Sequence, residues 1–269
     1  MSVEASQAGG LPARDPTIGY ALEARDLHID FGGVHAVNGA SFEVGRNRVT
    51  GLIGPNGAGK STALKLIVGA LHPTSGRVIF EGADITGWPP HKVAQHGIIR
   101  TFQLSSEFAR LTVIENLLVA APDQPGATFL GAMRGKRYWR RGQAELVERA
   151  RELLDEFRMT DAGDEYAGRL SGGQKRLVEI MRALMARPKV LLLDEPLAGV
   201  NPTLRLVIEE HLLRLREQGL TMVMIEHELG TVERCCESVI VMAQGRVLTE
   251  GTMAQLRAHP EVIDAYLAG

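Results

Sequence analysis

The sequence has few features of a secreted or membrane-embedded protein. Its only cysteines, Cys235 and Cys236, are adjacent and cannot close a loop that would hold a fold together, so we expect buried, reduced thiols. No apolar run approaches the roughly 18 to 20 residues that a membrane-spanning helix needs. The first twenty residues contain no apolar core like that of a secretory signal, and we expect residues 1–20 to be a flexible leader. These absences predict a chain that is soluble by itself in a reducing compartment.

An excess of positive charge is also missing. Lys and Arg number 30 against 32 Asp and Glu, a net charge of −2, which argues against a broad basic face for nucleic acid. A local basic insert lies at residues 131–142. It contains Arg134, Lys136, Arg137, Arg140 and Arg141 around Tyr138 and Trp139. Such a segment could touch lipid headgroups or nucleic acid, but a solvated helical face is the favoured interpretation. We therefore expect no nucleic-acid partner.

Strand-like and helix-like apolar patterns alternate along the chain, whose 269 residues suit one large domain with an inserted subdomain. Expected strands cover residues 21–43, 49–54, 190–193 and 221–225, with a hairpin at 238–247; expected helices cover 60–71, 113–121, 144–157, 171–185, 204–215 and 253–267. From residue 89 to residue 168 the pattern changes to helical stretches with a glycine- and arginine-rich segment between them, which suggests the inserted helical subdomain. Apolar strands that alternate with helices predict an α/β fold with a parallel sheet.

A glycine-rich phosphate-binding loop is expected between the strand ending near Gly54 and the helix beginning near Lys60. Glycines let the backbone wrap closely around phosphates, and the amides of the following helix terminus attract negative charge. Lys60 would contact the β- and γ-phosphates of ATP, and Ser61 would bind Mg²⁺. The predicted ATP-binding residues of this loop are Gly54, Pro55, Asn56, Gly57, Ala58, Gly59, Lys60, Ser61 and Thr62. The alternative is a plain glycine turn with an exposed lysine.

Two carboxylates, Asp194 and Glu195, follow the predicted buried strand 190–193. Ligands bind at the carboxyl ends of strands in open α/β sheets. Asp194 is therefore expected in the Mg²⁺ shell, and Glu195 is expected to orient or deprotonate the attacking water. The alternative is an acidic pair that caps the next helix.

The pentapeptide LSGGQ lies about twenty residues before LLLDEP and far after GPNGAGKST. With these motifs, the chain from Leu22 to Gly269 resembles the nucleotide-binding subunit of an ATP-binding cassette (ABC) transporter. The resemblance implies that Ser171, Gly172, Gly173 and Gln174 contact ATP held by a second ATPase subunit. Amides at a helix start suit that role, although a serine N-cap with a glycine turn would use the same residues.

The same resemblance implies further site residues and the fold. Phe31 would stack on adenine, with a core phenylalanine as the alternative. Gln103 would join Mg²⁺ and water to the helical subdomain, and His227 would contact the γ-phosphate; a surface glutamine and a structural histidine are their alternatives. The implied fold is a phosphate-loop NTPase core with an antiparallel β subdomain. One domain spans 21–269, with the helical subdomain at about 89–180 and short helices at about 252–269.

Several segments are similar to the branch that imports branched-chain amino acids, especially the larger of its two ATPase subunits. They are RTFQ, TVIENLLVA, AGVNP and the ending HPEVIDAYLAG. The likeness implies a cytoplasmic position on the inner face of the cell membrane, with integral membrane permease subunits and, through them, a substrate-binding protein as partners. Many family members have aspartate where this chain has Asn201, which removes a charge from the loop that crosses the dimer.

The resemblance implies that two subunits face head to tail around two ATP molecules and that Gln103 and residues 107–115 pass motion to the permease. Identical and mixed pairs both remain open, and the branch likeness favours a mixed pair. The rival functions are a soluble ABC ATPase scaffold of the iron-sulfur assembly type, and the ATPase of a lipopolysaccharide exporter or urea importer. DNA-repair and translation ABC proteins fit less well, because tandem cassettes, long coiled coils and zinc motifs are absent.

Overall fold

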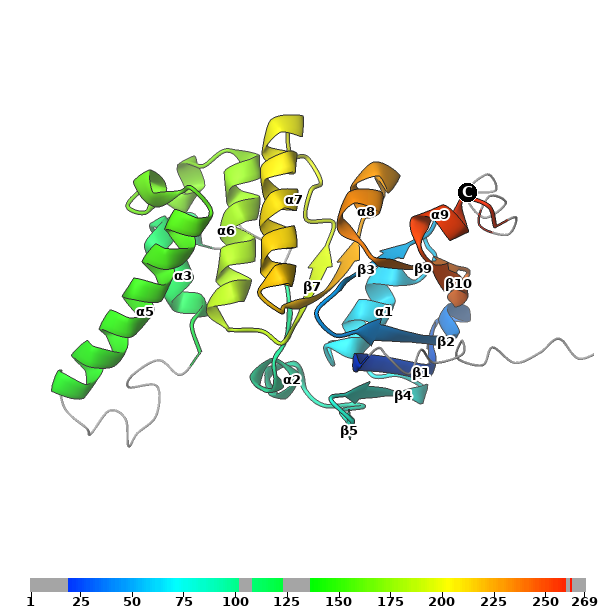
Figure 1. Ribbon diagram of the computed structural model, residues 1–269. Coiled ribbons are helices and arrows are strands. Elements are labelled where there is room, and N and C mark those ends of the chain that lie inside the picture. Colours follow the sequence, from blue (N-terminus) through cyan, green and yellow to red (C-terminus); the bar gives the residue numbers. More distant parts are fainter. Residues whose placement is uncertain (1–18, 102–107, 123–135, 260–261, 263–269) are drawn as a thin grey trace, which may run out of the picture.

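The structure is a computed structural model that describes residues 19–101, 108–122, 136–259 and 262 (Figure 1). These residues form two β-sheets. The smaller sheet is antiparallel in the order β2-β1-β4-β5, and its strands are β1 (Tyr20–Phe31), β2 (Val34–Gly45), β4 (Ser75–Phe80) and β5 (Ala83–Asp84). The larger sheet has the order β10-β9-β3-β8-β7-β6, and its strands are β3 (Val49–Ile53), β6 (Ile98–Arg100), β7 (Val190–Asp194), β8 (Thr221–Ile225), β9 (Ser238–Ala243) and β10 (Arg246–Gly251). In the larger sheet only the β9 and β10 pair is antiparallel among the strands described.

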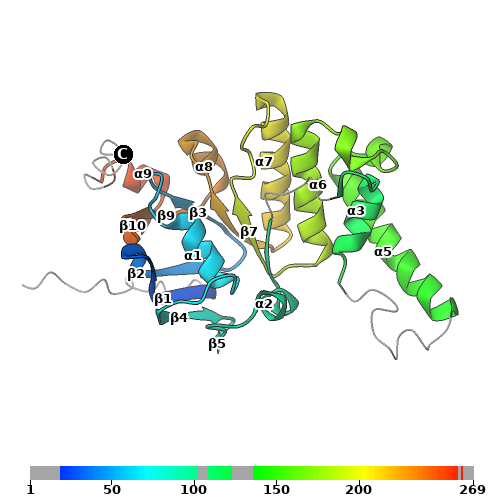
Figure 2. The same cartoon turned by 180° about the vertical axis from the view of Figure 1, so that it is seen from behind.

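Helices surround the larger sheet and extend to one side of it (Figures 1 and 2). They are α1 (Lys60–Ile67), α2 (Pro90–His96), α3 (Val113–Ala120), α5 (Lys136–Glu156), α6 (Gly172–Met185), α7 (Pro202–Glu217), α8 (Leu229–Cys235) and α9 (Met253–Leu256), with short 3₁₀ turns at Thr160–Ala162 and Ala167–Arg169. Across the described part of the chain, none of these helices has the length and apolarity to cross a bilayer. The predicted α/β class with an antiparallel β subdomain is confirmed.

Strand β7 separates two hydrophobic cores because its successive side chains point to opposite faces. Val190 and Leu192 pack with α1 and the smaller sheet, whereas Leu191 and Leu193 pack with α3, α5, α6 and α7. All five residues of β7 are buried, as expected for a strand covered on both faces. This double burial fixes the strand and hence the position of the carboxylates at its end.

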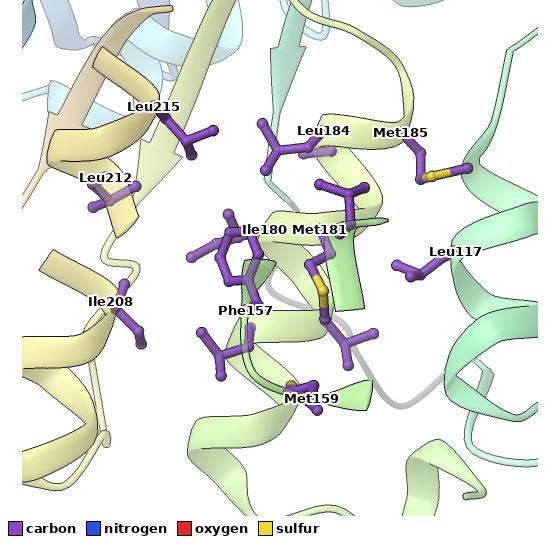
Figure 3. Packing of buried hydrophobic residues seen from close by; sticks show 14 of the residues in the cluster. Leu117, Phe157, Met159, Ile180, Met181, Leu184, Met185, Ile208, Leu212 and Leu215 are labelled. Atoms are coloured by element: carbon purple, nitrogen blue, oxygen red, sulfur yellow. The ribbon is translucent and has the colours of Figure 1, made fainter. Parts of the chain in front are cut away.

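The second of these cores joins the helical part of the chain to the sheet. Figure 3 shows Phe157 and Ile180 between α7, which contributes Leu212, and α3, which contributes Leu117. The ring of His211, also on α7, stacks on Phe157 with 4.5 Å between ring centroids and an interplanar angle of 24°. The base of the helical region is therefore attached through an apolar and aromatic contact.

Three predicted elements differ from the structure. The stretch from residue 89, in which only helices were predicted as regular elements, contains β6, which pairs with β7; a three-residue strand is too short to reveal a periodicity. Helix α1 ends at Ile67 because Gly69 turns the chain at φ 71°, where a Cβ would lie 2.0 Å from the carbonyl oxygen of Trp88. Helix α5 begins at Lys136, earlier than predicted. Residues 1–18, residues 131–135 of the basic insert and residues 260–261 and 263–269 near the end of the chain lie outside the described residues.

The two cysteines are free thiols, but only Cys235 is fully buried, whereas Cys236 is half-buried. Burial raises the pKa of the Cys235 thiol to about 12. The prediction of two buried thiols therefore holds for Cys235 and is too strong for Cys236.

Candidate functional site

Three glycines with positive φ shape the loop between β3 and α1. Gly54, Gly57 and Gly59 have φ angles of 146°, 78° and 97°. A Cβ on Gly54 would lie 2.0 Å from the carbonyl oxygen of Met242, and one on Gly59 would lie 2.4 Å from that of Ala36. Both conformation and space therefore require glycine at these two positions. The tight loop brings the backbone to the point where α1 begins.

Lys60, the first residue of α1, lies inside this loop. Its Nζ donates to the carbonyl oxygens of Gly54 at 2.7 Å and Pro55 at 2.9 Å, and only 6% of the residue is exposed. Burial lowers the pKa of Lys60, while Glu195 and Asp194 oppose that shift. No described side chain caps the start of α1, so its first amides face outward from the helix end. A loop of this shape, with a lysine at its centre, can bind phosphate groups.

Asp194 joins the phosphate loop to β6. Its Oδ1 accepts from Ser61 Oγ at 3.4 Å, and its Oδ2 accepts from Arg100 Nη2 at 2.5 Å. The Asp194 side chain is 2% exposed. Ser61 and Asp194 offer the hard oxygen ligands that Mg²⁺ prefers, and Mg²⁺ commonly takes only one or two protein ligands beside phosphates and water. The pair fits such an ion, with Arg100 balancing the second oxygen of Asp194.

Glu195 and His227 lie together after β7 and β8. Oε1 of Glu195 and Nε2 of His227 are 2.9 Å apart, and both side chains are partly exposed. Glu195 has a φ of 51°, and its amide donates to the carbonyl oxygen of Ile225 at 3.0 Å. The carboxylates do not cap the next helix, because α7 begins after Asn201. Glu195 therefore has a hydrogen-bonded partner and access to solvent, as a general base requires.

Asn201 is the N-cap of α7. Its Oδ1 accepts from the amide of Leu204 at 2.9 Å, and Pro202 follows at the first helical position. Asn is among the strongest N-cap residues, and Pro suits the first turn. Asn201 thus satisfies one of the free backbone amides at the start of α7.

The LSGGQ segment begins α6. Ser171 and Gln174 form a capping box: Ser171 Oγ accepts from the Gln174 amide at 3.4 Å, and Gln174 Oε1 accepts from the Ser171 amide at 3.0 Å. Ser171 and Gly172 are exposed, whereas Gly173 is buried. In Figures 1 and 2, α6 and α1 lie on opposite sides of β7 and α7. The LSGGQ segment and the phosphate loop of one chain are therefore apart.

The remaining predicted residues lie at the edges of the site. Phe31 ends β1, and its 47% exposure contrasts with the buried core phenylalanines, so it is free to meet a flat ring. Gln103 lies outside the described residues, although β6 ends only three residues before it. The structure therefore brings Lys60, Ser61 and Asp194 together at the phosphate loop. It also brings Glu195 into contact with His227.

Two site residues were missed by sequence reasoning. Arg100, in RTFQ, contacts Asp194, and Glu226, in IEHE, accepts the amide of Leu197 through Oε1 at 3.0 Å. Each lies close in sequence to a predicted residue. A charged residue at the end of an apolar strand was the available signal in both segments.

Comparisons with known proteins agree with this arrangement. The ABC transporter family matches residues 37–198, and the family described as branched-chain amino acid ATP-binding cassette transporter matches residues 246–267. Similar relatives include the high-affinity branched-chain amino acid transport ATP-binding protein BraF of Pseudomonas aeruginosa, 40% identical over 91% of this chain and 97% of the relative. The probable branched-chain amino acid transport ATP-binding protein LivG of Methanocaldococcus jannaschii is 40% identical over 88% and 93% of the two chains.

Among solved structures, a nucleotide-free ATP-binding cassette from an ABC transporter is 38% identical, with a TM-score of 0.81 over 92% of this chain and 99% of that one. A solved ADP conformation of such a cassette has the same TM-score at 36% identity, over 93% and 100% of the two chains. The matched family covers more than half of the chain, and these relatives and structures cover about nine-tenths of it. The chain belongs to the family of ABC transporter ATP-binding proteins.

Proposed function

We propose that this chain is the ATP-hydrolysing subunit of an importer for branched-chain amino acids. The observation that carries the proposal is the convergence, at the carboxyl ends of β3, β7 and β8, of the side chains proposed to bind phosphate, bind metal and catalyse hydrolysis. Lys60, Asp194 and Glu195 follow these parallel strands or their loops, and Lys60 is close enough to both carboxylates for their charges to influence its pKa. The match of residues 246–267 and the names of the relatives support the substrate class.

ATP binding follows from the loop. The amides of the phosphate loop and the start of α1 would donate to phosphate oxygens, and Lys60 would exchange its bonds to Gly54 and Pro55 for the β- and γ-phosphates. Phe31 would cover the adenine. Ser61 and Asp194, with Gln103, would hold Mg²⁺, which when bound neutralises charge on the phosphates.

Hydrolysis would use Glu195 and His227. Glu195 would accept a proton from a water molecule as the water oxygen attacks the γ-phosphorus of ATP. The bond between the γ-phosphorus and the oxygen that bridges it to the β-phosphate would break, which leaves ADP and phosphate. His227 would orient the Glu195 carboxylate and contact the γ-phosphate. The 2.9 Å between Glu195 Oε1 and His227 Nε2 supports this cooperation, because the two groups lie within hydrogen-bonding reach.

A second ATPase subunit is part of the proposal because one chain keeps its LSGGQ segment apart from its own phosphate loop. Ser171 and the first amides of α6 would reach ATP held by the facing subunit. ATP would then join the subunits, and loss of the γ-phosphate would reopen them. The pair would act on the cytoplasmic face of a membrane, against permease subunits that receive substrate from a binding protein.

Reconstitution tests this function directly. The chain is co-expressed with its candidate permease pair and second ATPase, and the purified complex is placed in liposomes with the substrate-binding protein and labelled leucine, isoleucine or valine. ATP-dependent uptake is expected with the wild-type chain and absent with Glu195→Gln. Hydrolysis without uptake of any of the three amino acids would overturn the substrate assignment. Purification of the chain with soluble partners alone would favour the scaffold function instead.

A further inference from the structure

Glu226 has no role in the mechanism above, yet it is a buried carboxylate next to His227, which contacts Glu195. It follows β8 directly, precedes His227 and is 7% exposed. A carboxylate loses its hydration when it is buried and is retained there only with hydrogen-bonding partners. The partners of Glu226 therefore indicate why it is there.

The carboxylate binds the loop that follows the catalytic residue. Glu226 Oε1 accepts from the amide of Leu197 at 3.0 Å, and the Leu197 side chain is itself buried, with 2% exposure. Two residues earlier, the amide of Glu195 donates to the carbonyl oxygen of Ile225 at 3.0 Å. On both sides of Pro196, these two bonds attach the segment after β7 to the last residue of β8 and the residue that follows it.

Glu195 needs such support because its backbone is in the left-handed region, at φ 51°. Residues with a Cβ rarely adopt this conformation unless the surrounding structure imposes it. The Ile225 bond holds one end of the turn, and the Glu226 bond holds the other. Released from Leu197, the turn could relax and move the Glu195 carboxylate away from His227.

The same loop ends against the LSGGQ segment. Val200 is buried, and a Cβ on Gly173 would lie 3.6 Å from its Cγ1 and 2.2 Å from Cδ2 of Leu204. Gly173 thus packs directly on the residues that enter α7. A displacement of the loop between Glu195 and Asn201 would therefore reach the helix start that is proposed to serve the facing subunit.

We propose that Glu226 is a positioning residue, whose carboxylate holds the Glu195–Asn201 loop against His227 and so links the catalytic carboxylate of one ATP site to the LSGGQ segment used by the other. This inference rests on the proposed ATPase function. The charged groups near Glu226 are Glu195 and Arg205, and Arg205 is itself paired with Glu228. The bond to Leu197 needs an acceptor oxygen at the reach of the Glu226 side chain, and a side-chain amide oxygen can also accept such a bond.

Two conservative variants separate reach from charge. Glu226→Gln keeps an oxygen at the same distance but loses the charge. Glu226→Asp keeps the charge but retracts the carboxylate by one methylene, about 1.5 Å. Glu250→Gln on β10 is the matched control, because burial also raises the pKa of this carboxyl and no described contact ties it to Glu195 or His227. ATPase rates are measured on the assembled dimer over a range of ATP concentrations.

We expect Glu226→Asp to lower kcat at least tenfold with the KM for ATP changed less than threefold, because misplacement by about 1 Å can cost up to a hundredfold in rate. Glu226→Gln and the Glu250→Gln control should keep kcat within threefold of wild type. Wild-type kcat in Glu226→Asp, or equal losses in the Asp and Gln variants, would overturn the assignment.

Thermal unfolding of all three variants identifies any loss of fold. If Glu226→Asp does not fold, Glu226→Gln decides by itself, because a tenfold loss of kcat in that folded variant would contradict the proposal. The proposed function is tested separately by the wild type. Absence of ATPase activity in the wild-type dimer would refute that function, whereas an active wild type with a fully active Asp variant would refute only the role of Glu226.

Discussion

Replacing His211 with leucine should stabilise the protein and make its stability less sensitive to acid. His211 is 1% exposed on α7, and neither ring nitrogen has a hydrogen-bond partner among the described residues. Leaving a buried polar group unpaired costs about 1 to 3 kcal/mol. Loss of the stacking contact with Phe157 would cost roughly 0.5 to 1.5 kcal/mol. The difference favours the leucine variant by about 1 kcal/mol at neutral pH.

The pH dependence gives this prediction a second, independent measure. Burial, aided by the charge of Arg214, lowers the pKa of His211 below 6.5, the ordinary value. In the unfolded chain His211 binds a proton near pH 6.5, whereas in the folded chain it binds one only at lower pH. The folded state is therefore destabilised as the pH falls below 6.5. The loss reaches at most about 1.4 kcal/mol for each pH unit between the two pKa values. The His211→Leu variant does not show this loss of stability, because leucine cannot bind a proton.

Urea unfolding at pH 7.5 and pH 5.5 measures both effects. The gain of His211→Leu over wild type should be about 1 kcal/mol at pH 7.5 and larger at pH 5.5. His91→Gln, at an exposed position on α2, is the matched control and should change neither value by more than about 0.5 kcal/mol. A leucine variant that is less stable than wild type, with the same difference at both pH values, would refute the reasoning.

Three other predictions concern the site and the thiols. Glu195→Gln should bind ATP, measured by fluorescence of a nucleotide analogue, yet hydrolyse it about 10² to 10⁴ times more slowly, and an unchanged rate would contradict its role as base. Ser171→Arg should leave ATP binding by the monomer intact while lowering turnover by the dimer, and lost monomer binding would place Ser171 in the chain's own site. Cys235, whose thiol pKa is raised to about 12 by burial, should react with iodoacetamide at pH 8 about a thousandfold more slowly than in the unfolded chain, as followed by mass spectrometry; rapid labelling of the folded chain would contradict its burial.

Sequence patterns predicted the elements whose signal is long or chemically specific. The strand before Asp194 was located by its continuous apolar run, and the helix after Ser171 by apolar residues at helical spacing. Strand β6 was missed because three residues cannot show a period. The early end of α1 was missed for a different reason: its apolar pattern continues to Leu71, whereas the chain turns at Gly69, where the backbone of Trp88 leaves no room for a Cβ.

The site residues divide in the same way into those that a sequence motif predicts and those that only the folded structure reveals. Motif spacing located the loop from Gly54 and the pair Asp194 and Glu195, because these groups act from fixed positions at strand ends. Contacts across strands could not be read from one segment alone. Arg100 reaches Asp194 only because β6 lies beside β7, and Glu226 reaches Leu197 only because β7 lies beside β8.

Successive side chains of β7 point into two different cores, and this alternation limits insertions and deletions in the strand. Insertion or deletion of one residue between Lys189 and Asp194 would turn every following side chain to the opposite face of the sheet. Leucines would then exchange cores, and Asp194 would point away from Ser61 toward the helices on the other side. Repacking of neighbouring side chains can compensate for substitutions within β7, but it cannot compensate for the insertion or deletion of one residue. Homologous chains should therefore accumulate different apolar residues in this strand while keeping the number of residues before the carboxylates unchanged.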